Sequence, residues 1–216
     1  MNILVLGGGG RGHAIAWALS QSPRCDQLYV APGNGGTASI AQNVKNLAVE
    51  EGDAVLSFAK DHEIGLVVVG PEAPLVAGVA DVVRAAGIPI FGPDAQGAQL
   101  EGSKTYSKEF MDANGIPTAR YASFTDEAQA RAYCEELGAP LVVKADGLAA
   151  GKGVIVAETL EVALDAVKEC FQGAFGEAGN RVVIEEMLKG PECSLLAFVS
   201  KGKAFCMAPA QDHKRA

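Results

Sequence analysis

Short apolar runs and stretches of helical spacing alternate along the first hundred residues. Each apolar run has strand length and continuous hydrophobicity, which is typical of a parallel strand buried on both faces. The helical stretches repeat their apolar residues three and four positions apart. The alternation, with short connections, predicts an open α/β parallel sheet. The predicted strands are 2–6, 28–31, 65–69 and 88–91, and the predicted helices are 13–20, 53–62 (with Asp53 as the N-cap) and 76–86.

After about Asn114 the pattern changes to an α+β arrangement with antiparallel pieces, which predicts a second domain. Apolar stretches on both sides of the tetrapeptide SKGK indicate a β-hairpin, because a short turn joins neighbouring antiparallel strands. The predicted helices of this half are 126–137 and 160–171, the predicted strands are 117–124, 140–144, 155–156 and 181–185, and the hairpin strands are 193–199 and 204–207.

Composition and charge narrow the class of protein. The 216 residues are enough for one large domain or two small ones, and the net charge of −8 argues against a nucleic-acid binder, which is normally basic. No apolar run approaches the roughly 20 residues of a membrane span, and Met1 leads into a strand without a secretory leader pattern. The five cysteines and three histidines are scattered, which predicts reduced thiols and no metal cluster. We therefore expect a soluble, cytoplasmic protein without nucleic-acid or membrane partners.

Four consecutive glycines follow the first predicted strand, and Gly7, Gly9 and Gly12 match the dinucleotide-binding spacing GxGxxG. Glycines at this place let backbone N–H groups approach an anion, and the start of the next helix adds a positive dipole end. A dinucleotide site also needs an acidic residue at the end of the second strand, but that strand runs into APGN. Arg11 suits a phosphate monoester. The loop is therefore predicted to bind phosphate, and a tight turn that only packs the helix on the sheet is the alternative.

Glu72 follows the third predicted strand and lies between two prolines in the segment PEAPL. Its carboxylate could accept hydrogen bonds from sugar hydroxyls or an amine, and the alternative is an exposed acid in a rigid loop. Three strand-end loops, GGGG, PGNGG and GPEAPL, share the carboxyl edge of the predicted sheet. Ligands of open α/β sheets bind at that edge, so we expect these loops to line one crevice.

Lys144 ends a predicted buried strand, and a glycine-rich loop from Asp146 to Gly153 follows it directly. A fixed lysine beside a glycine loop that can close is typical of a triphosphate site. The loop is not a Walker A motif, because Gly153 stands where Ser or Thr is required. The acidic segment from Glu185 to Leu188 reads as a hinge that could bind adenine and, with Glu192, an amine or ribose. A solvated hairpin with surface lysines is the alternative.

Two further charged features are candidates for phosphate contacts. Ser103 is predicted as the N-cap of a helix, so Lys104 would project from a helix start, unless it is an ordinary surface lysine. The run from Gln211 to Arg215 is the densest charged cluster of the sequence. From the residues alone it is best described as a solvated charge run.

Taken together, these segments resemble the phosphoribosylamine–glycine ligase (glycinamide ribonucleotide synthetase) family of ATP-grasp enzymes. The matching segments occur in the family's order and cover essentially the whole chain. GPEAPL, KADGLAAGKGV and QDHKR are the segments most specific to this ligase. The other segments are VLGGGGRGHAIAW, VAPGNGGTA, IFGPDAQGAQLEGSK and VIEEMLKGPECS.

The resemblance implies ATP-driven condensation of 5-phosphoribosylamine with glycine, through a glycyl phosphate, in purine biosynthesis. Positioning and charge neutralisation, with Mg²⁺ or Mn²⁺, would then matter more than a general base. The implied ATP contacts are Lys104, Lys144, Glu185, Glu186, Leu188 and Glu192, with Ala149, Ala150, Gly151, Lys152, Gly153 and Val154 as the closing loop. Gly9, Gly10, Arg11 and Glu72 would bind the phosphoribosylamine, and the implied catalytic residues are Lys144, Asp212, Lys214 and Arg215.

The resemblance also implies a division into a Rossmann-like pre-ATP-grasp domain (1–102), an ATP-grasp small lobe with a linker helix (103–190) and the first strands of the large lobe (191–216). Family members continue past QDHKR to the metal ligands and a C-terminal domain. We therefore expect an incomplete portion of the ligase, without metal ligands and without full activity alone. The alternatives are a non-catalytic nucleotide-binding fragment, another ATP-grasp ligase acting on a phosphoribosyl substrate, and an NAD-dependent oxidoreductase.

Overall fold

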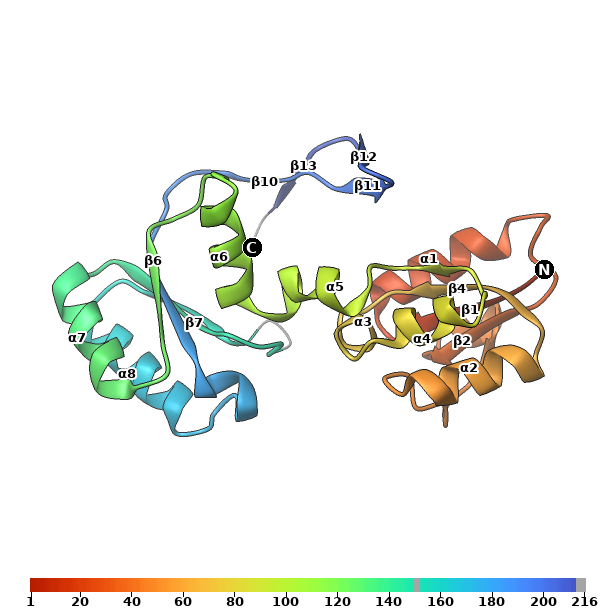
Figure 1. Ribbon diagram of the computed structural model, residues 1–216, viewed down its shortest axis with the longest axis horizontal. Helices are drawn as coiled ribbons and strands as arrows, with labels where there is room; N and C mark the ends of the chain where they lie inside the picture. The colour runs from red at the N-terminus through yellow and green to blue at the C-terminus, as the bar shows by residue number, and fades with distance from the viewer. Residues whose placement is uncertain (150–151, 213–216) are drawn as a thin grey trace.

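The computed structural model describes residues 1–149 and 152–212. Two α/β parts lie along the long axis of the molecule, two helices connect them, and an extended ribbon follows the second part (Figure 1). The order of the elements confirms the predicted fold class, an open parallel sheet followed by an antiparallel α+β part.

The first part is built on a five-stranded parallel sheet with strand order β3-β2-β1-β4-β5. Leu4 and Val5 on β1 are both fully buried, although successive side chains point to opposite faces of a strand. Apolar clusters therefore cover both faces of the sheet, as the continuous apolar runs predict. The strands are β1 (Asn2–Gly7), β2 (Leu28–Pro32), β3 (Gln42–Asn43), β4 (Ile64–Val69) and β5 (Ile90–Phe91).

The helices of this part differ from their predicted ends where glycine is involved. The first helix begins three residues early, after Gly9, which offers no capping side chain. The predicted helix 76–86 is interrupted at Gly78, whose φ is 83°. Asp53 lies in the first turn of its helix, and the N-cap is Glu51. The elements are α1 (Gly10–Ser20), η1 (Thr37–Ser39), α2 (Gly52–Asp61), α3 (Ala73–Val76) and α4 (Val79–Ala85).

Two consecutive helices, α5 (Ala95–Gly102) and α6 (Lys104–Ala113), connect the two parts (Figure 1). The sequence pattern did not predict α5, which contains an internal glycine and few apolar residues. The predicted cap of α6 is confirmed, because the Ser103 hydroxyl accepts a hydrogen bond from the Tyr106 N–H at 3.1 Å.

The second part has a four-stranded antiparallel sheet with strand order β6-β9-β7-β8. Leu141, Val143 and Ile184 point from one face into a core formed with two helices. The opposite face of the sheet lies toward α6. The elements are β6 (Tyr121–Phe124), α7 (Glu127–Leu137), β7 (Leu141–Ala145), β8 (Val154–Ala157), α8 (Leu160–Phe171), η2 (Gly176–Asn180) and β9 (Val182–Glu186).

The ribbon consists of two short antiparallel pairs, β10 with β13 and β11 with β12. The predicted strand 193–199 is therefore two strands, because its two halves pair with different segments. Lys201 and Gly202 both have positive φ, as a two-residue hairpin turn requires. The apolar side chains of the ribbon are largely exposed to solvent, and the exposed fraction reaches 82% at Phe205. The strands are β10 (Glu192–Ser194), β11 (Ala197–Ser200), β12 (Lys203–Cys206) and β13 (Ala210–Asp212).

Candidate functional site

The first glycine loop combines close packing with an open outer surface. A Cβ on Gly12 would lie 3.3 Å from the Gly7 carbonyl carbon, so this glycine lets α1 pack directly on the end of β1. A Cβ on Gly9 or Gly10 would meet no atom within 4 Å. Close packing at Gly12 and open space at Gly9 and Gly10 therefore occur in one loop, so the packing role and the predicted phosphate role do not exclude each other.

Arg11 and Glu72 bind each other at the edge of this loop. Arg11 Nη1 lies 2.6 Å from Glu72 Oε1 and also donates to the Gly70 carbonyl at 3.0 Å. The hydrogen bond from Arg11 lowers the pKa of the Glu72 carboxyl below its ordinary value. Both side chains are accessible to solvent, with 68% of Arg11 and 38% of Glu72 exposed. Two predicted substrate residues are thus brought together.

Asn34 connects the second strand-end loop to the glycine loop. Its amide nitrogen donates to the Gly8 carbonyl at 3.0 Å, and its amide oxygen accepts from the N–H groups of Gly36 and Thr37. Together with the Arg11 contact to Gly70, this confirms that the three loops meet at one edge of the sheet. The sequence reasoning did not assign Asn34, although an Asn between glycines is a known signal for such a turn.

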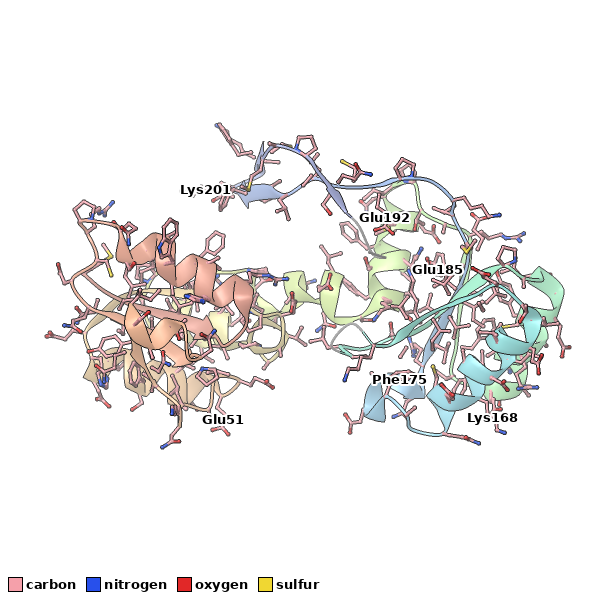
Figure 2. All side chains as sticks on the ribbon, turned by 180° about the vertical axis from the view of Figure 1, so that it is seen from behind. Glu51, Lys168, Phe175, Glu185, Glu192 and Lys201 are labelled. Atoms are coloured by element: carbon pink, nitrogen blue, oxygen red, sulfur yellow. The ribbon has the colours of Figure 1, made fainter. Side chains whose placement is uncertain are left out.

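Lys144 and Glu185 share one face of the second sheet. Val142 pairs with Glu185 and Lys144 pairs with Val183, so Lys144 and Glu185 are diagonal neighbours on adjacent strands. Lys144 Nζ lies 2.8 Å from Glu185 Oε1. Figure 2 shows Glu185 in the region between α6 and this sheet. The structure therefore joins two of the predicted nucleotide residues directly.

Lys108, on α6, completes this charged group and was not identified from the sequence. Its ammonium lies 3.0 Å from Glu185 Oε2 and donates to the Thr118 hydroxyl at 2.6 Å. Lys108 and Lys104 are four residues apart and therefore share a helix face. That spacing was a possible signal, but the pairing depends on a strand that is distant in sequence.

Asp146 anchors the start of the second glycine loop to α6. Its carboxylate accepts from the Thr105 N–H at 2.6 Å and from the Ser103 hydroxyl at 3.1 Å. Lys104 Nζ donates to the Gly147 carbonyl at 3.0 Å. Burial lowers the pKa of Lys104, and the charge of Lys144 acts in the same direction. The helix start, the loop and both lysines thus form one polar cluster.

The described ends of the loop lie close together. The Gly153 carbonyl accepts from the Ala145 N–H at 2.8 Å, and a Cβ on Gly153 would lie 2.7 Å from the Ala149 Cβ. Val154 pairs with Lys144 across β7 and β8. Lys152 is exposed, whereas Ala150 and Gly151 lie outside the described residues.

Glu186, Leu188 and Glu192 follow Glu185 along the chain. The Glu186 carboxylate accepts a hydrogen bond from the Arg120 N–H at 2.9 Å, just before the start of β6. Leu188 is 70% exposed. Glu192 begins the ribbon (Figure 2), and its backbone pairs with Asp212. Lys214 and Arg215 lie outside the described residues.

A cavity of about 510 Å³ opens beside Asp146 and Gly147. Val76 lines it from the first part of the chain, Gly102 from the connecting helix α5, and Leu148 and Arg181 from the second part. The base of the second glycine loop therefore borders a space shared by both parts.

The described residues contain neither a metal-binding group nor a membrane-spanning helix. Within 1–149 and 152–212, no three residues of the types His, Cys, Asp and Glu gather as a metal site would require. Over the same residues, no helix is both long and apolar enough to span a bilayer.

Comparison with known proteins now identifies the family. The family model described as phosphoribosylglycinamide synthetase, N domain, matches residues 1–101, and the model of the ATP-grasp (A) domain of the same synthetase matches residues 102–216. The chain belongs to the phosphoribosylglycinamide synthetase family.

Curated relatives and solved structures agree with this family. The chain is 56% identical over 218 residues to phosphoribosylamine–glycine ligase of Pasteurella multocida and 55% identical to that of Vibrio cholerae. The crystal structure of phosphoribosylamine–glycine ligase from Thermotoga maritima superposes with a TM-score of 0.80 at 29% identity and covers the whole chain. The chain spans 51% of the length of each of these three synthetase-family proteins.

A more distant structure shares the fold alone. N5-carboxyaminoimidazole ribonucleotide synthetase from Thermus thermophilus has a TM-score of 0.73 at 22% identity, over 99% of this chain and 55% of that one. The fold is therefore shared beyond this family, and the family assignment rests on the family models and the closer sequence matches.

Proposed function

We propose that this chain provides the phosphoribosylamine-binding and ATP-binding elements of a phosphoribosylamine–glycine ligase. The observation that carries the proposal is the pair of glycine-rich loops on two separate sheets, each next to a cation, Arg11 at the start of α1 and Lys144 near the end of β7. Membership of the synthetase family supports the assignment of the first loop to the sugar phosphate and of the second to ATP. We propose domain limits of 1–102, 103–190 and 191–216 on the same basis.

In the proposed reaction, a glycine carboxylate oxygen attacks the γ-phosphorus of ATP and ADP leaves. The amine of phosphoribosylamine then attacks the carbonyl carbon of the glycyl phosphate, phosphate leaves, and the amine loses a proton. Lys104 and Lys144 would neutralise the ATP phosphates, and the loop 149–154 would exclude water. The cavity beside Asp146 lies between the two parts, where the two substrates must meet.

The remaining proposed residues have roles at the two substrates. Gly9 and Gly10 would present backbone N–H groups to the sugar phosphate, with Arg11 and Glu72 beside it. Leu188 and Glu192 would contact the nucleotide. Asp212, Lys214 and Arg215 would act near the reacting phosphates. ATP-grasp relatives imply Mg²⁺ or Mn²⁺, but the described residues offer no ligand group for it, so no step is assigned to the ion.

Calorimetry with ATP, NAD and ribose 5-phosphate tests the binding assignments, since ribose 5-phosphate has the phosphate of the proposed substrate. We expect ATP and ribose 5-phosphate to bind independently and NAD not to bind. NAD binding at the first loop would favour an oxidoreductase, and absence of ATP binding would overturn the proposal. Release of phosphate that requires both glycine and phosphoribosylamine would separate the ligase from other ATP-grasp ligases.

A non-catalytic nucleotide-binding role is the second candidate. It rests on the Lys144–Glu185 group, which can bind a nucleotide without a reaction following. In that case ATP would bind, but no phosphate release would depend on glycine. The same assay therefore separates the two candidates.

A further inference from the structure

Lys108 is a buried cation whose ammonium has a carboxylate, a hydroxyl and an aromatic ring as neighbours. Only 9% of its side chain is exposed. Its ammonium contacts the Glu185 carboxylate and the Thr118 hydroxyl, and it lies 5.3 Å from the centre of the Tyr121 ring. A lysine is rarely buried to this extent unless it is paired, and here the pairing is to a residue of the proposed ATP site.

Glu185 lies between two lysines, and only one of them reaches the surface. Lys108 is 3.0 Å from one carboxylate oxygen, and Lys144 is 2.8 Å from the other. The side chains of Lys108 and Glu185 are 9% and 6% exposed, whereas that of Lys144 is 26% exposed. Two ammonium groups and one carboxylate give the group a net charge of +1. The buried pair is neutral, so the surplus positive charge is available at Lys144.

We propose that Lys108 is a positioning residue for the ATP phosphates. By holding one oxygen of Glu185, it fixes the carboxylate that orients Lys144 and prevents that carboxylate from cancelling the charge of Lys144. The inference rests on the proposed function, because it assumes that Lys144 contacts a phosphate group of ATP. Lys108 itself touches neither substrate nor reacting atoms.

A purely structural role for Lys108 makes a different prediction about charge. If Lys108 only stabilises the packing of α6 on β9, its loss weakens the binding of all ligands that need this part of the fold. If it sets the charge at Lys144, its loss weakens ATP binding and leaves adenosine binding almost unchanged. Removal of the Glu185 carboxylate as well would then restore the charge at Lys144 and recover part of the ATP affinity.

The experiment measures ATP and adenosine affinity by calorimetry on the full chain and its variants. We expect Lys108→Met to weaken ATP binding by at least about tenfold, the scale of one charge-assisted contact, and adenosine binding by less than about threefold. Lys108→Arg should recover most of the loss, because it keeps the charge. Lys168→Met, which removes an exposed lysine of α8, is the matched control and should leave both affinities unchanged.

The double variant Lys108→Met with Glu185→Gln decides between charge and packing. We expect it to bind ATP at least about threefold more tightly than Lys108→Met alone, since Lys144 again has no opposing carboxylate. Recovery stays incomplete, because the carboxylate that orients Lys144 is lost as well. A double variant that binds ATP no better than Lys108→Met overturns the inference. So does an equal loss of ATP and adenosine affinity in Lys108→Met.

The test remains decisive if Lys108→Met does not fold or if the unaltered chain does not bind ATP. If Lys108→Met does not fold by circular dichroism, the double variant is compared with Glu185→Gln alone, and a tenfold or larger difference in ATP affinity overturns the inference. If the unaltered chain does not bind ATP, the proposed function fails together with this inference. Normal ATP binding by both the unaltered chain and Lys108→Met overturns the inference alone.

Discussion

Two glutamates near strand ends are each paired with a cation, yet the pairs differ in burial. The Arg11–Glu72 pair is short but exposed, and exposed ion pairs contribute between zero and about 1 kcal/mol because water competes for both charges. The pairs of Glu185 with Lys108 and Lys144 are largely buried, where an unpaired charge is costly. The first pair can therefore exchange partners when a ligand arrives, whereas the second is part of the folded structure.

The largest expected effect is at Glu185. Glu185→Ala leaves the Lys108 ammonium buried without its carboxylate, and we expect the free energy of unfolding to fall by about 3–5 kcal/mol. Glu72→Ala is the matched control at the exposed pair, with an expected change below about 1 kcal/mol. Urea unfolding followed by circular dichroism measures both. Similar losses in the two variants would contradict the contrast between the pairs.

Lys144 is expected to affect ligand binding more than stability, since it is the most exposed of the three residues. Lys144→Ala should weaken ATP binding by about 2–3 kcal/mol, or roughly 30- to 150-fold, as one charge-assisted contact to a phosphate is lost. Calorimetry measures the change, with Lys168→Ala as the control at an exposed lysine of α8. An unchanged affinity would remove Lys144 from the nucleotide site.

A smaller effect separates the glycines of the first loop. Gly12→Ala places a Cβ 3.3 Å from the backbone of Gly7, and we expect a loss of about 1–2 kcal/mol of stability from this overpacking. Gly9→Ala meets no atom within 4 Å and should leave stability unchanged while weakening ribose 5-phosphate binding. Thermal unfolding and calorimetry on the two variants test this division. Equal stability of both variants would show that the loop does not pack as described.

The smallest effect concerns the titration of Glu72. Its pKa is lowered in the folded state, chiefly by the hydrogen bond from Arg11. The pair therefore stabilises the fold above the ordinary carboxyl pKa, and this contribution is lost as the pH falls through the lowered value. Arg11→Ala should raise the pKa of Glu72, which an NMR titration of the carboxyl carbon measures. A pKa that does not move would mean that Arg11 and Glu72 are not paired in solution.

Local patterns predicted most of the regular structure. Continuous apolar runs identified β1, β2 and β4, because these strands are buried on both faces. Ser103 and Asp126 were correctly predicted as helix N-caps, and the predicted helix 160–171 has the observed ends of α8. Two of the errors lie where no side chain gives a signal. Gly9 begins α1 without a cap, and Gly78 interrupts a stretch that is apolar throughout.

The candidate site could be predicted only in part, because its contacts join distant segments. Lys144 and Glu185 were identified from their strand ends, and the sheet register then explains their contact. Lys108 was missed because nothing near it in sequence indicates that it is buried against β9. The hydrogen bond from the Arg120 N–H to the Glu186 carboxylate was not predicted either, because Arg120 is 66 residues away in sequence. In the ribbon, the sequence indicated strands but not that their apolar side chains would be exposed.

Asp146 has a consequence for engineering this molecule. Its N–H donates to the carbonyls of Ala178 and Arg181, and its carboxylate accepts from the first turn of α6, so it is fixed from two sides. A hinge placed after Gly147, whose carbonyl accepts a hydrogen bond from Lys104 on α6, would therefore let the loop move without disturbing the helix. An insertion after Leu148 would lengthen the loop with this hinge intact, whereas replacing Asp146 would release the loop and the helix together. The loop can thus be redesigned independently of the scaffold that holds it.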